Sequence, residues 1–218
     1  TAPVIGVTGS RGKTIVKEWL YQLLCADYSI VRSPRSYNSQ IGVPLSIWEM
    51  NDDTQLAIFE AGISLPNEMA SLQAMIRPQL AIITNIGDEH SEGFNSDKAK
   101  CEEKVMLCRD CDCIVYNGDD SLIREVVENA GLTVKEIAWS RKDPDSPLYI
   151  SKVTKQKDST IIKYSYLQYD GEIVIPFTTD ADVENAIHCL AVMLYLCRPF
   201  DVIAARMSSL APVGTRLN

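Results

Sequence analysis

A glycine-rich stretch near the start of the chain has the residue types that bind phosphate. It comprises Thr8, Gly9, Ser10, Arg11, Gly12, Lys13 and Thr14. Glycines let backbone N–H groups turn toward phosphate oxygens, the lysine supplies a positive charge for the β- and γ-phosphates, and the last threonine hydroxyl can bind Mg²⁺. The spacing is GxxGKT, shorter than the common GxxxxGKT. An ordinary glycine turn before a helix with an exposed lysine is the alternative. The position between an apolar run and an amphipathic segment favours phosphate binding.

Two further groups of polar residues follow apolar runs. Glu60 stands near the end of the run 55–61, and His90 follows the run 79–84 among Asp88, Glu89 and Glu92. In open α/β sheets, ligands bind outside the carboxyl ends of the strands, so we expect Glu60 and His90 to lie near the glycine-rich stretch. Carboxylate oxygens suit Mg²⁺. Taken singly, a helix-capping acid and a solvated loop histidine remain the alternatives.

The elements that must position these residues alternate through the first two thirds of the chain. Six apolar runs have the length of strands, namely 4–8, 28–32, 55–61, 79–84, 113–116 and 134–139. Amphipathic segments typical of helices follow the glycine-rich stretch and lie at 66–76, 97–108 and 121–129. This alternation predicts an α/β fold, with a mostly parallel sheet covered by helices on both faces, over residues 1–142.

The pattern changes at the turn-rich residues 143–147. The runs 148–154, 160–168 and 172–177 alternate polar and apolar residues, and Asp170-Gly171 has the composition of a hairpin turn. We therefore expect a small antiparallel β subdomain over 143–180. Helices at 183–196 and 201–210 follow, within a C-terminal segment 181–218. Because the chain opens directly on a strand and closes without a capping element, we expect a domain excised from a longer protein.

Composition excludes several classes of partner. The net charge of −8, without a long basic run, argues against nucleic acid and anionic membranes. No apolar stretch is long enough to insert into a membrane. Seven scattered cysteines are an odd count that fits reduced thiols in a cytoplasmic protein. Cys108 and Cys111 form a CxxC, but no second pair of ligands accompanies it, so packing is favoured over zinc binding.

These motifs together resemble those of the Mur ligases, the ATP-dependent amide ligases of peptidoglycan synthesis. The glycine-rich stretch is similar to the family's TGTNGKT loop, and residues 83–90 resemble a segment that ends in a metal-binding histidine. Glu60 matches the family's magnesium-binding glutamate. The resemblance implies a P-loop central domain that binds ATP and two Mg²⁺ ions, with Thr14, Glu60 and His90 as metal ligands and Asn85 at the nucleotide.

The resemblance also implies a lysine carbamylated by CO₂ that binds the second Mg²⁺. In the family it lies in a helix ahead of a strand that ends in NxDD, which residues 117–120 resemble. Lys104 stands thirteen residues before Asn117 and is the preferred candidate, with Lys98 and Lys100 as weaker ones. A solvated helix lysine is the competing interpretation.

Two C-terminal residues match nucleotide-binding positions of the family. Asn185 is similar to the asparagine that meets adenine, although Ala181-Asp182 replace the preceding His-Asn. Arg216 is similar to an arginine that contacts the nucleotide. Arg11 replaces the asparagine usual in the loop. It is counted with Gly9, Ser10 and Gly12 among the loop residues that bind ATP, and the role of its side chain is left open.

Within the family, the sequence motifs are most like those of the members that add D-alanyl-D-alanine to UDP-N-acetylmuramoyl tripeptide, including those fused to alanine racemase. The similarity lies in residues 60–69 and 37–44. The first four residues of the second stretch are implied to bind substrate, namely Tyr37, Asn38, Ser39 and Gln40. It implies flanking N- and C-terminal domains on the same full-length chain and an isolated domain without activity. Another Mur or folylpolyglutamate-type ligase, and a non-catalytic nucleotide-binding module, remain as alternatives.

Overall fold

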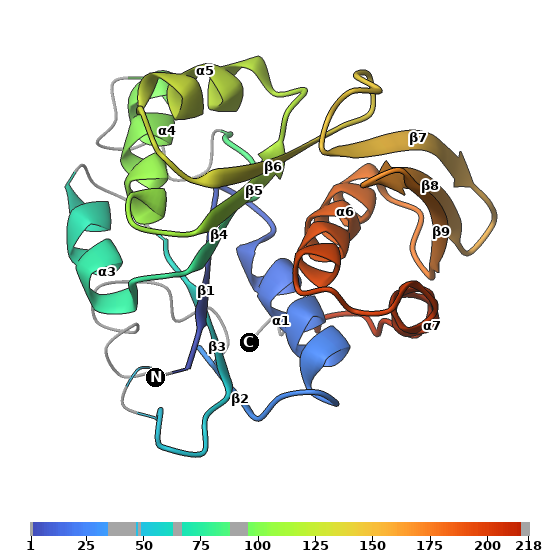
Figure 1. Cartoon of the computed structure of the whole chain (residues 1–218), viewed down its shortest axis with the longest axis horizontal. Coiled ribbons are helices and arrows are strands. Elements are labelled where there is room, and N and C mark those ends of the chain that lie inside the picture. Colours follow the sequence, from blue (N-terminus) through green and yellow to red (C-terminus); the bar gives the residue numbers. More distant parts are fainter. Residues whose placement is uncertain (1, 35–46, 48, 63–66, 88–95, 215–218) are drawn as a thin grey trace.

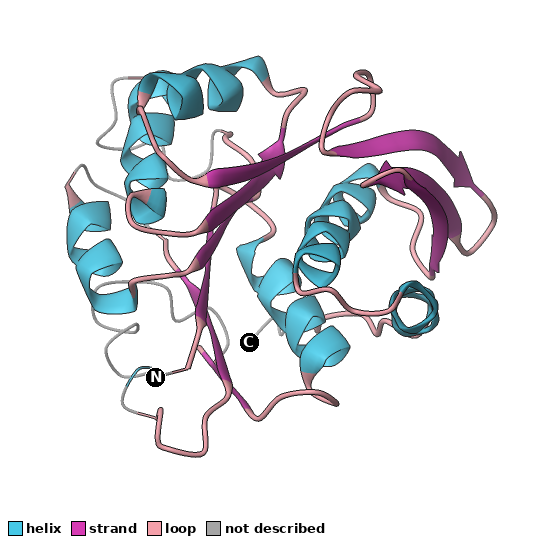
Figure 2. Ribbon diagram, in the orientation of Figure 1, coloured by secondary structure: helices cyan, strands magenta, loops and turns pink. Residues whose placement is uncertain are grey.

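The computed structural model of the chain describes residues 2–34, 47, 49–62, 67–87 and 96–214. The described strands form one nine-stranded sheet in the order β2-β3-β1-β4-β5-β6-β7-β8-β9 (Figures 1 and 2). The strands are β1 (Val4–Thr8), β2 (Ile30–Arg32), β3 (Leu56–Glu60), β4 (Leu80–Ile83), β5 (Cys113–Asn117), β6 (Lys135–Ser140), β7 (Leu148–Lys155), β8 (Thr160–Tyr166) and β9 (Tyr169–Ile175).

Helices cover both faces of the parallel part of the sheet. Figure 1 shows α3, α4 and α5 on one face and α1, α6 and α7 on the other. The helices are α1 (Lys13–Leu24), α3 (Glu68–Ile76), α4 (Asp97–Val105), the 3₁₀ turn η1 (Met106–Cys108), α5 (Ser121–Asn129), α6 (Asp180–Tyr195) and α7 (Phe200–Ser208). Every residue of β1, β3 and β4 is buried. These strands are therefore largely apolar, as expected of parallel strands covered on both sides.

The predicted α/β class and mostly parallel sheet are confirmed. All six apolar runs form strands within two residues of their predicted bounds, and β1 matches its bounds in full. The helix predicted at 121–129 is also matched in full by α5. The predicted helix 97–108 divides into α4 and the tighter turn η1. The last predicted helices begin earlier than expected. α6 starts at Asp180 because the Thr179 hydroxyl accepts a hydrogen bond from the Asp182 N–H and caps the helix.

The last three strands extend the main sheet. β6 and β7 pair in parallel through Trp139 and Leu148, and β7, β8 and β9 then pair antiparallel. In Figure 1 this extension curves around α6 and α7. The hydrogen bonding of the predicted antiparallel region is thus continuous with that of the α/β core.

The hairpin turn predicted at Asp170-Gly171 is wrong. The β8–β9 turn is at Leu167 and Gln168, which both have positive φ, while Gly171 lies within β9 opposite Tyr164. A Cβ at Gly171 would come within 2.4 Å of the Tyr164 ring. Glycine is therefore required there by the close approach of an aromatic ring. The sequence pattern alone could not distinguish this requirement from that of a turn.

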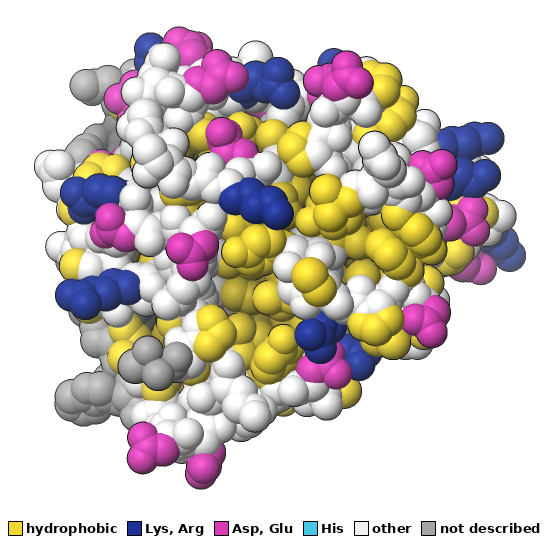
Figure 3. Space-filling model, in the orientation of Figure 1, with side chains coloured by type: hydrophobic (Ala, Val, Ile, Leu, Met, Phe, Trp, Pro, Cys, Tyr) yellow, Lys and Arg dark blue, Asp and Glu magenta, His cyan; other side chains and the backbone are white. Residues whose placement is uncertain are grey.

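The surface carries mixed charge on the face seen in Figure 3. Acidic and basic side chains lie scattered over it, and hydrophobic side chains gather across the middle and toward β9 and α7. No broad basic area appears on this face, in keeping with the negative net charge. Among the described helices, none has the length and apolar character needed to cross a bilayer.

His188 connects α6 to the sheet. Its Nδ1 atom accepts a hydrogen bond from the Trp139 indole at 3.1 Å, and its Nε2 atom lies 3.0 Å from the Thr84 carbonyl oxygen. An indole N–H only donates, so Nδ1 is the acceptor and Nε2 carries the proton toward Thr84. The imidazole is fully buried, and this burial lowers its pKa to about 4. His188 therefore joins the helix to the sheet in the core, and the histidine is neutral at physiological pH.

We predict that His188 makes the fold sensitive to mild acid. The unfolded imidazole takes up a proton below pH ~6.5, whereas the native one resists protonation down to pH of about 4. Stability is therefore full above this window and falls by up to ~1.4 kcal/mol per pH unit within it. Chemical denaturation at pH 7 and 4.5 measures how far the free energy of unfolding falls on acidification. This fall should be smaller by about 2 kcal/mol in His188→Gln than in the parent chain. Equal losses in the two proteins would contradict the assignment.

Candidate functional site

The glycine-rich loop connects the end of β1 to the start of α1. Gly9 has φ +140° and Gly12 has φ +85°, backbone conformations that residues with a side chain rarely adopt. A Cβ on Gly9 would lie 1.9 Å from the Thr84 hydroxyl, so only glycine fits there. Gly12 caps α1 and offers no side-chain acceptor to the first N–H groups of the helix. Helix termini of this kind attract anions.

The end of β4 fixes the loop through its backbone. The Ser10 N–H donates to the Asn85 carbonyl at 2.9 Å, and the Arg11 N–H donates to the Asn85 side-chain oxygen at 2.9 Å. In turn, the Thr84 hydroxyl and the Asn85 amide donate to the Arg11 carbonyl at 2.6 and 3.0 Å. Arg11, whose side-chain role was left open, thus contributes its backbone to loop closure while the residue itself is exposed. The predicted contact of Asn85 with nucleotide stays a prediction.

Two buried lysines meet at one carbonyl oxygen of the loop. The Lys13 Nζ atom donates to the Gly9 oxygen at 2.9 Å, and the Lys104 Nζ atom donates to the same oxygen at 3.1 Å. Their nitrogens are therefore at most about 6 Å apart. At an effective dielectric constant of roughly 20, two positive charges at that separation repel by about 3 kcal/mol. Two lysine side chains are thus concentrated at this end of the loop.

The three lysines of α4 differ in environment. Lys98 is exposed and pairs with Glu125 at 3.5 Å. Lys100 is buried and donates to the Gly87 carbonyl, with Asp97 3.6 Å away. Lys104 is buried one turn later and reaches the loop itself. The structure therefore separates Lys98 from the other two candidates for carbamylation, and Lys104 is the one that contacts the glycine-rich loop.

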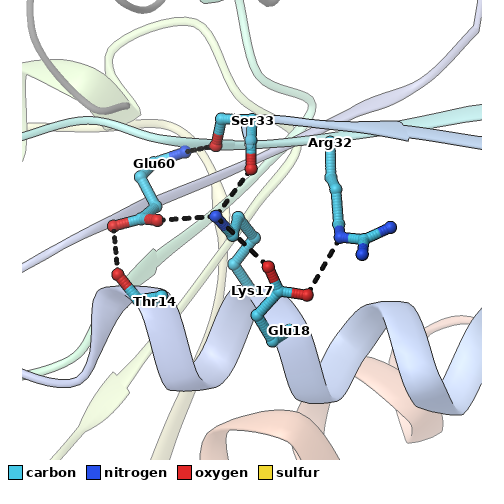
Figure 4. Close-up of polar contacts among 6 residues, drawn as sticks. All are labelled: Thr14, Lys17, Glu18, Arg32, Ser33 and Glu60. Carbon is cyan, nitrogen blue, oxygen red and sulfur yellow. Dashed lines mark hydrogen bonds and ion pairs between the residues drawn. The ribbon is translucent and has the colours of Figure 1, made fainter. Parts of the chain in front are cut away.

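Glu60 lies at the carboxyl end of β3, beside the start of α1 (Figure 4). Its Oε1 atom accepts a hydrogen bond from the Thr14 hydroxyl at 2.9 Å, and its side chain is fully buried. The parallel register places Glu60 opposite Val7 on β1, at the level of the loop. The two residues expected to share a metal are thus adjacent.

Asn185 lies against the loop from α6. It is buried, and its side-chain oxygen is the atom that a Cβ on Gly12 would meet at 2.5 Å. The structure brings Asn185 to the start of α1, next to the glycine-rich loop. Its expected contact with adenine stays a prediction.

The NxDD residues after β5 stabilise the local fold. The Asp120 carboxylate caps α5 by accepting from the Leu122 and Ile123 N–H groups, each at 3.1 Å. Asp119 accepts hydrogen bonds from the Ser140 hydroxyl and from the Arg141 N–H. The motif therefore joins β5 to the end of β6.

Several predicted site residues lie outside the described part of the chain. They are His90 with its neighbours Asp88, Glu89 and Glu92, the predicted substrate residues Tyr37, Asn38, Ser39 and Gln40, and the predicted nucleotide contact Arg216. Their roles stay predictions.

Sequence reasoning missed Lys17 and Ser33. Lys17 is fully buried, and its Nζ atom lies 2.9 Å from Glu60 Oε2 and 2.6 Å from the Ser33 carbonyl oxygen (Figure 4). One signal was available, because Lys17 follows Lys13 by four residues and so lies on the same side of α1. The partner Ser33 could not be identified in this way, since it follows a different element, β2.

The cysteines of the CxxC pack in the core, as expected. Cys108 and Cys111 are buried, as is the neighbouring Cys113, and the Cys111 thiol donates to the Cys108 carbonyl at 3.0 Å. Within the described ranges, no group of three or more potential ligands from His, Cys, Asp and Glu is arranged to hold a metal ion.

We predict that Gly9→Ala disrupts the loop far more than Gly131→Ala. Both positions have positive φ, but nothing lies within 4 Å of a Cβ at Gly131, whereas Thr84 blocks the one at Gly9. Backbone strain of about 1–3 kcal/mol affects either variant, and the clash adds to it only at Gly9. Denaturant unfolding of both variants measures the difference. Equal losses of stability would show that the contact with Thr84 does not restrict this position.

Comparison with known proteins gives consistent matches along the chain. A family model described as the Mur ligase middle domain matches residues 7–193. The UDP-N-acetylmuramoyl-tripeptide–D-alanyl-D-alanine ligase of Rickettsia prowazekii is 39% identical over 218 residues, which cover 96% of this chain and 48% of that protein. The Bacillus subtilis enzyme of the same name is 28% identical over 217 residues, covering 98% of this chain and 46% of the relative.

A solved structure gives the same result. The MurF ligase of Thermotoga maritima in complex with ADP superposes with a TM-score of 0.85 at 25% identity, covering all of this chain and 50% of the other. The chain spans about half the length of the curated relatives it matches. Because the family model covers most of the chain and the fold agrees with it, the chain belongs to the Mur ligase family, whose middle domain it contains.

Proposed function

We propose that the full-length protein containing this chain is an ATP-dependent amide ligase of peptidoglycan precursor synthesis. It would join D-alanyl-D-alanine to UDP-N-acetylmuramoyl tripeptide, the reaction for which its relatives are named. The observation that carries the proposal is the meeting of Lys13, Thr14 and Glu60 from two elements at one edge of the sheet. A solved relative holds ADP, which supports nucleotide binding by this fold.

The reaction must bring two anions together. The substrate carboxylate attacks the γ-phosphorus of ATP, ADP leaves, and an acyl phosphate results. The amine of D-alanyl-D-alanine then attacks the acyl carbon, phosphate leaves, and the amine loses a proton. At roughly 4 Å and an effective dielectric constant near 20, one pair of like charges repels by about 4 kcal/mol. Lys13, together with the N-terminus of α1, offsets this repulsion at the phosphates.

The residues present fit a magnesium ion at the end of the loop. The Thr14 hydroxyl and the Glu60 carboxylate are hard oxygen donors 2.9 Å apart, the ligand type that Mg²⁺ prefers. The buried Thr8 hydroxyl oxygen has no hydrogen-bond partner within the described residues. A phosphate bound nearby would supply such a partner, which favours the proposal. Bound Mg²⁺ would neutralise phosphate charge. Thr14 and Glu60 would hold that ion.

We propose a second metal position at Lys104 and His90. Carbamylation by CO₂ would convert the Lys104 ammonium into an anionic oxygen ligand, and the close approach of Lys13 favours such a loss of positive charge. Lys100 is the alternative, since it is equally buried on the same helix.

The remaining assignments complete the proposal. Asn85, Asn185 and Arg216 would contact ATP together with the loop residues Gly9, Ser10, Arg11 and Gly12. Tyr37, Asn38, Ser39 and Gln40 would contact the substrates. Flanking domains of the full-length chain would complete the site, so the isolated domain would be inactive. A cytoplasmic location fits the free cysteines, and fusion to alanine racemase stays a prediction.

Release of ADP by the full-length protein tests the function directly. We expect turnover with UDP-N-acetylmuramoyl tripeptide and D-alanyl-D-alanine together, and little when the dipeptide is replaced by a single amino acid. Turnover with another acceptor would indicate a different Mur or folylpolyglutamate-type ligase. ADP binding without turnover on any acceptor would indicate a nucleotide-binding module.

We predict that Lys13→Ala abolishes turnover in the full-length protein. The substitution removes the charge that faces the phosphates, and loss of one such group lowers the rate by about 10²-fold or more. Steady-state ADP release measures it, with the exposed Lys155→Ala as the control. Near-normal turnover in Lys13→Ala would refute the phosphate-loop assignment.

We predict that Lys104→Ala also loses activity, which added bicarbonate fails to restore. A residue without an amine has no site for carbamylation, whereas parent enzyme depleted of CO₂ should recover with bicarbonate. Lys100→Ala and the exposed Lys98→Ala, assayed in parallel, identify which lysine is modified. Unchanged kinetics in Lys104→Ala would transfer the role to Lys100 if that variant alone loses the bicarbonate response.

A further inference from the structure

The Glu60 carboxylate is held from two opposite sides. Thr14 donates to Oε1 at 2.9 Å, and the Lys17 ammonium lies 2.9 Å from Oε2 (Figure 4). Thr14 and Lys17 are three residues apart on α1, and both side chains point toward the end of β3. One oxygen of the carboxylate therefore faces the phosphate loop, and the other faces away from it.

Lys17 is fixed by more than Glu60. Its Nζ atom donates to the Ser33 carbonyl at 2.6 Å and lies 3.6 Å from Glu18 Oε1. Oxygens from β3, the end of β2 and α1 thus surround one fully buried ammonium group. An ammonium has three N–H donors, so several oxygens can hold it at once.

An outer ion pair supports this arrangement. Glu18 Oε2 accepts from the Arg32 Nε atom at 2.9 Å, and the Arg32 guanidinium lies 3.5 Å above the Tyr21 ring. Positive and negative charges alternate from Arg32 through Glu18 and Lys17 to Glu60. Because buried charges are stable only when they are paired, this alternation stabilises the buried ion pair between Lys17 and Glu60.

We propose that Lys17 is a positioning residue for the metal-binding carboxylate. By holding Oε2, it makes Glu60 present Oε1 alone, beside the Thr14 hydroxyl, to Mg²⁺. This inference rests on the proposed function, in which Glu60 binds the metal. Partners that orient a ligand from outside the coordination sphere commonly change metal affinity by about 10–100-fold.

Lys17 also fixes the chain at Ser33. Ser33 lies four residues before Tyr37 in the sequence, and its hydroxyl accepts a hydrogen bond from the Glu60 N–H at 3.2 Å. The same ammonium therefore holds both the metal-binding carboxylate and the residue that leads into the predicted substrate stretch.

The alternative is that Lys17 acts only as a compensating charge. The two roles differ in the sign of their effect on metal binding. Removal of a bare positive charge near a cation site strengthens binding of the cation, because a repulsion is lost. Removal of a positioning group weakens binding, because Glu60 loses its fixed orientation.

Manganese binding by the full-length protein in the presence of ADP distinguishes the two. Mn²⁺ replaces Mg²⁺ and is followed by electron paramagnetic resonance, which requires no turnover. The variants are Lys17→Met, Lys17→Arg and Glu60→Gln. Lys155→Met is the matched control, because Lys155 pairs with Asp180 at the surface. ADP binding in EDTA reports whether each variant keeps its fold and its phosphate loop.

We expect Lys17→Met to weaken Mn²⁺ binding at least about tenfold, with metal-free ADP binding unchanged. Lys17→Arg, which keeps the charge and N–H donors, should recover most of the affinity, and Lys155→Met should match the parent. Should Lys17→Met lose metal-free ADP binding, Lys17→Gln replaces it under the same expectation, since its amide retains a donor for Ser33.

Unchanged or tighter Mn²⁺ binding in the neutral variant would overturn the positioning role. The proposed function itself would fail differently, through absence of ADP-dependent Mn²⁺ binding in the parent protein or its persistence in Glu60→Gln.

Discussion

Parallel pairing of β1 with β3 and β4 is the constraint on which the candidate site depends. It places Val7 opposite Glu60 and Thr8 opposite Ile83, so the chain leaves all three strands at the same edge of the sheet. The glycine-rich loop then closes against Thr84 and Asn85 through hydrogen bonds to its own backbone. A shift of register would separate the loop from both Glu60 and the end of β4, even if every side chain stayed the same.

Local charge at this edge opposes the charge of the whole molecule. The chain carries a net charge of −8, yet Lys13, Lys17, Lys100 and Lys104 are all buried near the loop. Exposed charges farther away are screened over about 8 Å at physiological ionic strength, whereas buried lysines are screened much less. An anionic nucleotide can therefore bind a protein that is acidic overall. The lysines also contact different groups, because Lys13 and Lys104 donate to the loop while Lys17 is directed to Glu60.

Residues of the C-terminal third pack against this edge of the sheet and hydrogen-bond to it. α6 brings Asn185 against the loop and places His188 between Trp139 of β6 and Thr84 at the end of β4. Thr84 uses its hydroxyl for the Arg11 carbonyl and its own carbonyl for His188, so one residue connects the loop to the buried helix. The antiparallel strands β7 to β9 curve around α6 and α7 and cover the apolar surfaces of both helices.

The sequence by itself determined the α/β class, the glycine-rich loop, the position of Glu60 at the end of a buried strand and the resemblance to the family. These features depend on periodicity and on residues adjacent in the chain, which a linear pattern records. The tertiary structure decided the rest. It placed Gly171 inside a strand because of the Tyr164 ring, separated Lys98 from Lys100 and Lys104 by burial, and assigned Arg11 a backbone role. It also revealed Lys17, whose partners Ser33 and Glu60 lie 16 and 43 residues away in the chain. Such contacts form only when strands distant in sequence pair, so no local pattern encodes them.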